Sequence, residues 1–265
     1  MRCVIVIVLT AVFMLSSAPA FSHWGGRVRI EVISDRGNEF LTLPFKEFQT
    51  GGTHVIKRYL EAKKGENYSI VIRNNMSERI GVAIAVDGRN IITGKKSYLK
   101  NNEMMYIVEP YGYTKLEGWR TDDNTVHRFY FTDVQDSYAV RTFSDTSAMG
   151  VIAIAVFREK DRPKILHEEQ IQKEKAPTAP QGSAKGELKR YENDAAGTGF
   201  GNETYSPVIK VEFEPEVFPF EKILVKYEWH EVLCKKGILK CWTEERNRLW
   251  DESEYAPYPP GYIYR

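Results

Sequence analysis

The sequence predicts an all-β protein, built as an antiparallel β-sandwich. Short runs of apolar and β-branched residues recur along the chain between turn signals, with no helical stretch between them. Aromatic residues make up 12% of the chain, and 15 of its residues are tyrosine, which strands favour. A chain of 265 residues can bury one large core, or one core with a small companion.

The first element is a leader-like N-terminus. Arg2 precedes an apolar run at 4–15, and a stretch of small residues at 16–20 ends in Ala18-Pro19-Ala20. This order is typical of a cleaved secretory signal peptide, and an uncleaved anchor helix is the alternative. The run is shorter than the ~20 residues that cross a bilayer. We therefore expect a signal peptide at 1–20, a mature chain exported to the periplasm or the extracellular space, and no transmembrane segment.

The charge balance argues against one class of partner. Without Arg2, the 37 basic residues become 36, equal to the 36 acidic residues. Because phosphate neutralisation dominates nucleic-acid affinity, a chain without net charge is not expected to bind nucleic acid.

Strands are then expected in order up to residue 160. Residues 27–34 alternate polar and apolar side chains, which indicates a strand with one buried face. The clearest pair follows at 68–74 and 80–86, and Asp87-Gly88 predicts a tight turn after it. The full set of expected strands in this part is 27–34, 54–60, 68–74, 80–86, 90–94, 104–108, 113–119, 126–131 and 148–157.

Two of these strands are predicted to lie inside a sheet. In 80–86, large apolar residues occupy one face, and Gly81, Ala83 and Ala85 occupy the other. The strand at 148–157 is likewise apolar on both faces. We therefore expect both strands to be covered on both sides.

The composition changes near residue 160. A charged, helix-permissive stretch at 161–175 precedes a Pro/Gly/Ala-rich stretch, and two further strands are predicted at 208–213 and 222–229 before an aromatic tail. The expected organisation is a β-sandwich domain at 21–160, a charged helix and linker at 161–200, and a small C-terminal β-rich extension at 201–265. Because two strands cannot hold themselves together, the extension should dock on the sheet edge or on a partner chain.

Removal of the leader would leave two cysteines, Cys234 and Cys241. An even count in an exported chain predicts a disulfide, and Gly237 between them allows the required turn. Two cysteines by themselves do not complete a zinc site, and no metal is expected.

Three stretches resemble an uncharacterised family of exported bacterial β-rich proteins. They are residues 79–94 (RIGVAIAVDGRNIITG), 116–120 (LEGWR) and 149–157 (MGVIAIAVF), and residues 197–201 and 205–208 are also similar to it. The resemblance implies a location in the cell envelope and a β-rich domain. It implies no activity.

The predicted ligand-binding residues are Arg89, Trp119 and Arg120. An exposed Trp119 beside Arg120 could stack on a sugar or anchor a partner, whereas the alternative is a tryptophan that caps the end of the core. Arg89 lies in the turn after 80–86 and could face a ligand, or could simply belong to a hairpin turn.

Other motifs give weaker signals. The glycine-rich stretch 197–201 lacks the spacing and context of a dinucleotide site and is interpreted as a flexible connector. Asp122 and Asp123 offer calcium-type ligands without EF-hand spacing, and a polar turn is the alternative. The five histidines lack metal-site spacing, so no catalytic residue and no cofactor are assigned.

The sequence therefore predicts a non-enzymatic exported protein that works by binding or assembly, with an envelope protein or a glycan as its partner. Two alternatives remain open at this point: a secreted hydrolase that acts on envelope polysaccharide with a pair of carboxylates, and a structural module stabilised by calcium.

Overall fold

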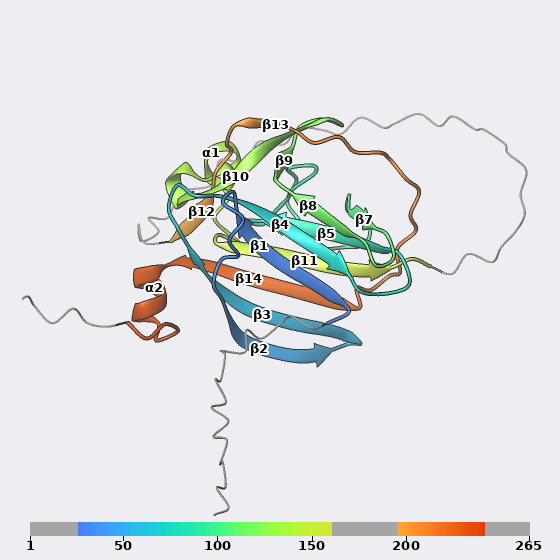
Figure 1. Cartoon of the computed structure of the whole chain (residues 1–265), viewed down its shortest axis with the longest axis horizontal. Helices are drawn as coiled ribbons and strands as arrows, with labels where there is room; N and C mark the ends of the chain where they lie inside the picture. The colour runs from blue at the N-terminus through green and yellow to red at the C-terminus, as the bar shows by residue number, and fades with distance from the viewer. Residues whose placement is uncertain (1–25, 161–194, 242–265) are drawn as a thin grey trace, which may run out of the picture.

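The computed structural model describes residues 26–160 and 195–241, and these residues form two sheets that pack together as a β-sandwich (Figure 1). The first sheet contains β1 (Val28–Ser34), β4 (Asn67–Asn74), β8 (Tyr113–Leu116), β9 (Gly118–Arg120), β10 (Thr125–Asp133), β12 (Ala196–Thr198) and β13 (Glu203–Tyr205). The second contains β2 (Thr42–Thr50), β3 (Thr53–Ala62), β5 (Ile80–Val86), β6 (Arg89–Asn90), β7 (Tyr106–Val108), β11 (Val151–Arg158) and β14 (Glu221–Trp229). The predicted all-β class is confirmed.

Three short helical segments complete the described chain. They are the 3-10 helix η1 (Val134–Asp136), α1 (Tyr138–Phe143) and α2 (His230–Lys235). The expected helix at 161–175 lies outside the described residues, as do the leader and the aromatic tail. Within the described ranges, none of the helices has the length and apolarity that a membrane span requires.

The core lies between the two sheets and follows from period-two patterning. In β1, Val28, Ile30 and Val32 point inward and are buried, as the alternation predicts. They pack in one cluster with residues of the opposite sheet, such as Ile84 and Ile154. Burial of this shared apolar surface is the main term that holds the sheets together.

Both strands predicted to be interior lie inside the second sheet, and β5 is covered on both faces. On the outer face of β11, Ala155 and Phe157 are buried, whereas Val151 and Ala153 are half-buried. β5 pairs with β11 on one side and with β6 and β7 on the other, and all of its residues are buried. A Cβ at Gly81 would lie 2.5 Å from the Met105 Sδ and from the Phe213 ring. The small residues on the outer face therefore admit a close outer layer of loop side chains.

The C-terminal segment is part of the sandwich rather than an attachment at its edge. β14 lies between β3 and β11, parallel to β3 and antiparallel to β11 (Figure 1). Its inward side chains Ile223, Val225 and Tyr227 are fully buried. The expectation of docking at the edge is wrong for β14, because these apolar residues alternate as in any central strand. The parallel pair also makes the second sheet mixed rather than purely antiparallel.

Strand positions mostly agree with the sequence, but several differ. The strand expected at 90–94 is wrong, because β6 ends at Asn90 and residues 91–93 form a turn. The short strands β12 and β13 were not expected, because no alternating pattern marks them. The edge strand β2 was not expected, because most of its residues are half-exposed or exposed and Pro44 interrupts its pattern. The expected strand at 113–119 is divided into β8 and β9 at Glu117. The strand expected at 208–213 is wrong, because these residues belong to neither sheet.

Candidate functional site

Trp119 is buried in the core and is not an exposed contact residue. It lies in β9 and is 2% exposed, and its Nε1 donates a hydrogen bond to the Gly199 carbonyl at 3.0 Å. Its ring also packs against Phe129 and Tyr138. The structure therefore supports the alternative in which this tryptophan caps the end of the core.

Arg89 and Arg120 hold neighbouring segments of the chain. Arg89 is 8% exposed, and its Nη2 lies 2.6 Å from Asp145 Oδ2 while its guanidinium covers the Phe143 ring. Arg120 is half-buried and donates to the Tyr106 hydroxyl at 2.9 Å and to the Ser206 carbonyl at 2.9 Å. The three predicted binding residues thus do not form one exposed patch.

The glycine-rich stretch 197–201 is packed rather than a free connector. Gly197 and Thr198 are buried in β12, which pairs with β10. A Cβ at Gly199 would overlap the Tyr130 ring. The interpretation as a flexible connector is wrong, because these glycines permit a close approach between backbone and side chains.

Asp87, in the turn after β5, is the centre of a buried polar network that sequence reasoning missed. Its carboxylate accepts hydrogen bonds from the Gly150 amide at 2.7 Å, the Thr198 amide at 2.7 Å and the Tyr227 hydroxyl at 2.5 Å. The Thr198 hydroxyl also lies 2.8 Å from the Tyr68 hydroxyl and 2.7 Å from that of Tyr227. The network therefore joins both sheets through the middle of the core.

Burial controls the protonation of this network. Desolvation raises the pKa of Asp87 to about 6, against the opposing effect of the Tyr227 hydroxyl, the two amides and Lys226. Burial likewise raises the pKa values of Tyr227 and Tyr68 well above the ordinary tyrosine value. Three protein donors converge on the Asp87 carboxylate, an arrangement that ties the two sheets together.

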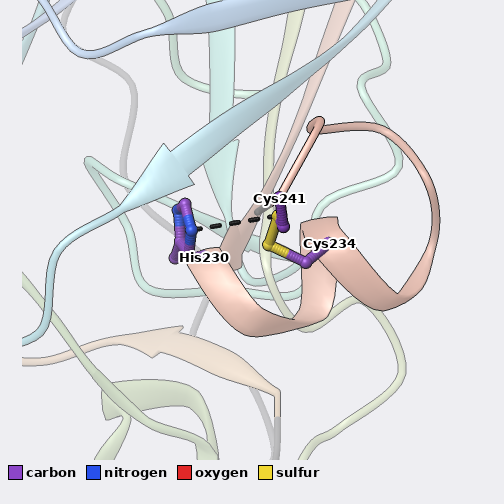
Figure 2. Close-up of side chains that lie close together, drawn as sticks. All are labelled: His230, Cys234 and Cys241. Atoms are coloured by element: carbon purple, nitrogen blue, oxygen red, sulfur yellow. Dashed lines mark hydrogen bonds between the residues drawn. A yellow bond between two sulfur atoms is a disulfide. The ribbon is translucent and has the colours of Figure 1, made fainter. Parts of the chain in front are cut away.

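A second cluster lies at the C-terminal end of β14, where His230, Cys234 and Cys241 come together (Figure 2). Cys234 and Cys241 form a disulfide with Cα atoms 5.5 Å apart, which confirms the predicted pair. The His230 Nε2 atom lies 3.9 Å from the Cys241 sulfur. His230 and Cys241 are exposed, and Cys234 is half-buried.

Local structure explains how His230 reaches the sulfurs. His230 and Cys234 are four residues apart in α2, so their side chains lie one helical turn apart on the same face. Gly237 then has a φ of +68°, which lets the chain turn back toward Cys241. The four-residue spacing was visible in the sequence, but it becomes informative only once residues 230–235 are known to be helical.

Glu61 fixes the orientation of the imidazole. Its Oε1 lies 2.9 Å from His230 Nδ1, so Nε2 is the nitrogen that faces the sulfurs. Glu61 and His230 also line an open pocket of about 550 Å³, together with Asp133, Glu231 and other residues at the end of β3. Asp133 is paired with Lys64 there. This pocket holds carboxylates, an imidazole and lysines within reach of a polar ligand.

The predicted calcium ligands serve other contacts. Asp122 accepts a hydrogen bond from the Asn124 amide at 2.7 Å, which closes a polar turn, and Asp123 pairs with Lys210 at 2.9 Å. Both carboxylates therefore have protein partners that favour the turn interpretation.

Several exposed apolar side chains lie on residues 205–218, here called the extended segment, and Tyr98, Tyr111 and Tyr113 are exposed elsewhere. Ile209 is 89% exposed, and the set with Tyr205, Val211, Val217 and Phe218 is exposed throughout. Arg120 and the Asn124 carbonyl hold one end at Ser206, and Arg158 and Lys160 hold the other at Glu216 and Glu214. Figure 1 shows this segment running between β13 and β14 around the outside of the sheets.

Comparison with protein-family models, with curated proteins and with solved structures finds no match to this chain.

Proposed function

We propose that this chain is an exported protein of the cell envelope that acts by binding a partner, and that the extended segment is the contact surface. The observation that carries the proposal is the exposure of Ile209 at 89% and Phe218 at 72% on a segment held at both ends. Exposed large apolar side chains that follow one another along one segment are the pattern from which we infer an interaction site.

The anchoring of the segment favours binding energetically. A contact surface that is already ordered loses less conformational entropy when a partner docks. Here Arg120 donates to the Ser206 carbonyl, Arg79 donates to the Glu212 carbonyl at 3.0 Å, and the Glu216 amide donates to the Arg158 carbonyl. Ile209 and Val211, two positions apart on an extended chain, then project in the same direction. An extended protein segment or a glycan face would fit such a row.

Export is supported by the disulfide. Cys234 and Cys241 are bonded, and such bonds persist mainly in oxidising compartments outside the cytoplasm. The leader-like residues 1–20 lie outside the described residues, and their role is part of the proposal.

The test is site-specific photo-cross-linking in intact cells. A photoreactive residue at Ile209 should form a discrete adduct with one envelope component, and Ile209→Asp combined with Val211→Asp should abolish co-purification of that component. A photoreactive residue at the exposed Lys95 is the matched control and should form no such adduct. The same adduct from both positions, or none from Ile209, would remove the basis of the proposal.

The pocket beside His230 gives the hydrolase alternative a defined location. It brings together Glu61, Asp133 and Glu231, and a glycosidase needs two carboxylates. Glu61 and Asp133 are, however, engaged with His230 and Lys64. Turnover of a polysaccharide panel that is lost in Glu61→Gln would favour this alternative over binding.

A further inference from the structure

We propose that His230, Cys234 and Cys241 form a Zn²⁺ site when the disulfide is reduced. The proposal does not depend on the proposed function. It assigns the C-terminal turn two states: an oxidised state closed by the disulfide, and a reduced state closed by the metal. Thiolates and imidazole are the donor types that zinc prefers.

The positions of the three donor atoms fit one metal ion. The His230 nitrogen and the two sulfurs all lie within 4.8 Å of one another, and His230 Nε2 is 3.9 Å from the Cys241 sulfur. Tetrahedral zinc with bonds of about 2.0 Å to nitrogen and about 2.3 Å to sulfur places nitrogen and sulfur roughly 3.6 Å apart, and two sulfurs roughly 3.8 Å apart. The nitrogen is therefore almost in place. The two sulfurs need to separate, which side-chain rotation can provide once their bond is broken.

The contact with Glu61 prepares His230 to act as a ligand. A ligating imidazole commonly donates its other N–H to a carboxylate, which fixes its tautomer and raises its basicity. The His230 Nδ1–H donating to Glu61 Oε1 at 2.9 Å leaves the Nε2 lone pair directed toward the sulfurs. A disulfide that only closes the turn does not require this carboxylate–imidazole pair. The pair is therefore the observation that points to a metal.

A dithiol reductant supplies the electrons and protons that the reduction of the disulfide requires. The dithiol transfers two electrons and two protons to the Cys234–Cys241 bond, which becomes two thiols, and the dithiol becomes a disulfide. Zn²⁺ then replaces the two thiol protons, which are released to solvent, and takes His230 Nε2 as its third ligand. A fourth position stays available on the exposed side, where water or a ligand can bind.

The test uses the full mature chain and Zn²⁺ or Co²⁺ as the probe. After reduction with a phosphine without oxygen, the protein should bind one Zn²⁺ per chain in competition with a chromophoric chelator. Co²⁺ should give the absorption of a tetrahedral thiolate complex. The unreduced protein should bind neither metal at this site.

Variants distinguish this site from binding by the two thiols alone. His230→Asn should weaken Zn²⁺ binding by the reduced protein at least tenfold, and Glu61→Gln should weaken it by about 10–100-fold. His127→Asn is the matched control, because His127 lies in β10, stacked on Phe200, and should leave the affinity unchanged. An affinity that His230→Asn does not alter, equal binding by the oxidised protein, or no binding after reduction would each overturn the proposal. An unfolded reduced chain would bind Zn²⁺ without help from Glu61, which reaches His230 only in the folded protein. The loss of affinity in Glu61→Gln therefore identifies binding by the folded turn.

Discussion

At the scale of single residues, one carboxylate connects the two sheets. Asp87 sits at a φ of +49° in the turn after β5 and accepts its hydrogen bonds from β12, from β14 and from the residue before β11. In the sequence, Asp87-Gly88 indicates only a turn. A turn signal describes the backbone, and the burial of the side chain depends on strands that lie more than 60 residues away.

We expect Asp87 to make stability depend on pH. Its pKa is raised from 3.8 to about 6 in the folded protein, so folding favours the protonated form. The resulting stabilisation is complete below pH 3.8 and is lost as the pH rises to about 6, with a size of roughly 2–3 kcal/mol. Denaturant unfolding of the wild type and of Asp87→Asn between pH 4 and 7 checks this.

Asp87→Asn is a suitable comparison for the pH dependence because asparagine tolerates the left-handed backbone and does not titrate. Its free energy of unfolding should vary less with pH than that of the wild type over this range. Parallel curves for the two proteins would mean that Asp87 does not titrate as described.

The prediction that Trp119 and Arg89 bind a ligand also failed because it concerned single residues. Trp119 and Arg89 were singled out as residue types that bind ligands when exposed. Both are buried here: the residue after β12 supplies the Gly199 carbonyl for Trp119, and the loop after α1 supplies Asp145 for Arg89. Exposure is a property of the assembled fold, and neither partner is close in sequence.

At the scale of elements, β12 shows how glycine can mark packing instead of flexibility. Gly199 follows β12, and its amide donates to the Tyr130 carbonyl at 2.9 Å while the Tyr130 ring fills the space that a Cβ would need. The spacing of Gly197, Gly199 and Gly201 gave no means of telling a free loop from a backbone pressed against an aromatic ring.

Gly199→Ala should therefore lower the free energy of unfolding by about 1–3 kcal/mol, the usual cost of overpacking. Gly26→Ala is the control, because its Cβ would meet only ordinary contacts of 3.5 Å or more. Chemical denaturation measures both variants, and equal stabilities for the two would contradict the close packing of β12.

Patterns of side chains within a single strand gave the most reliable predictions of structure. The alternation in β1 and the small-residue face of β5 placed both strands correctly in the sandwich, because period two is local information. The edge strand β2 carries no such signal, since most of its side chains face solvent.

At the scale of the whole molecule, the order of strands in space departs from their order in the chain. β14 comes last among the strands of the described residues, yet it occupies the position between β3 and β11. The expected division at residues 160 and 201 follows the composition, but residues on both sides of it build the same two sheets. Composition reports where the chain changes character and does not report which strands pair.

A chain that ends at residue 160 should not form a stable sandwich. It lacks β12 and β14, so β3 and β11 lose their shared partner and the core loses Ile223, Val225 and Tyr227. We expect no cooperative thermal unfolding, as followed by circular dichroism, and recovery when residues 195–241 are supplied as a separate peptide. Cooperative unfolding of the truncated chain near the temperature of the full chain would contradict the integral role of β14.

Export of a disulfide-bonded sandwich is the claim on which the proposed binding role depends most. Mass spectrometry of the protein purified from its native source, digested with and without reduction, tests it directly. We expect an N-terminus near Phe21 and a linked pair of peptides that carries Cys234 and Cys241. A chain that begins at Met1, recovered from the cytosol with both of these thiols free, would contradict the account.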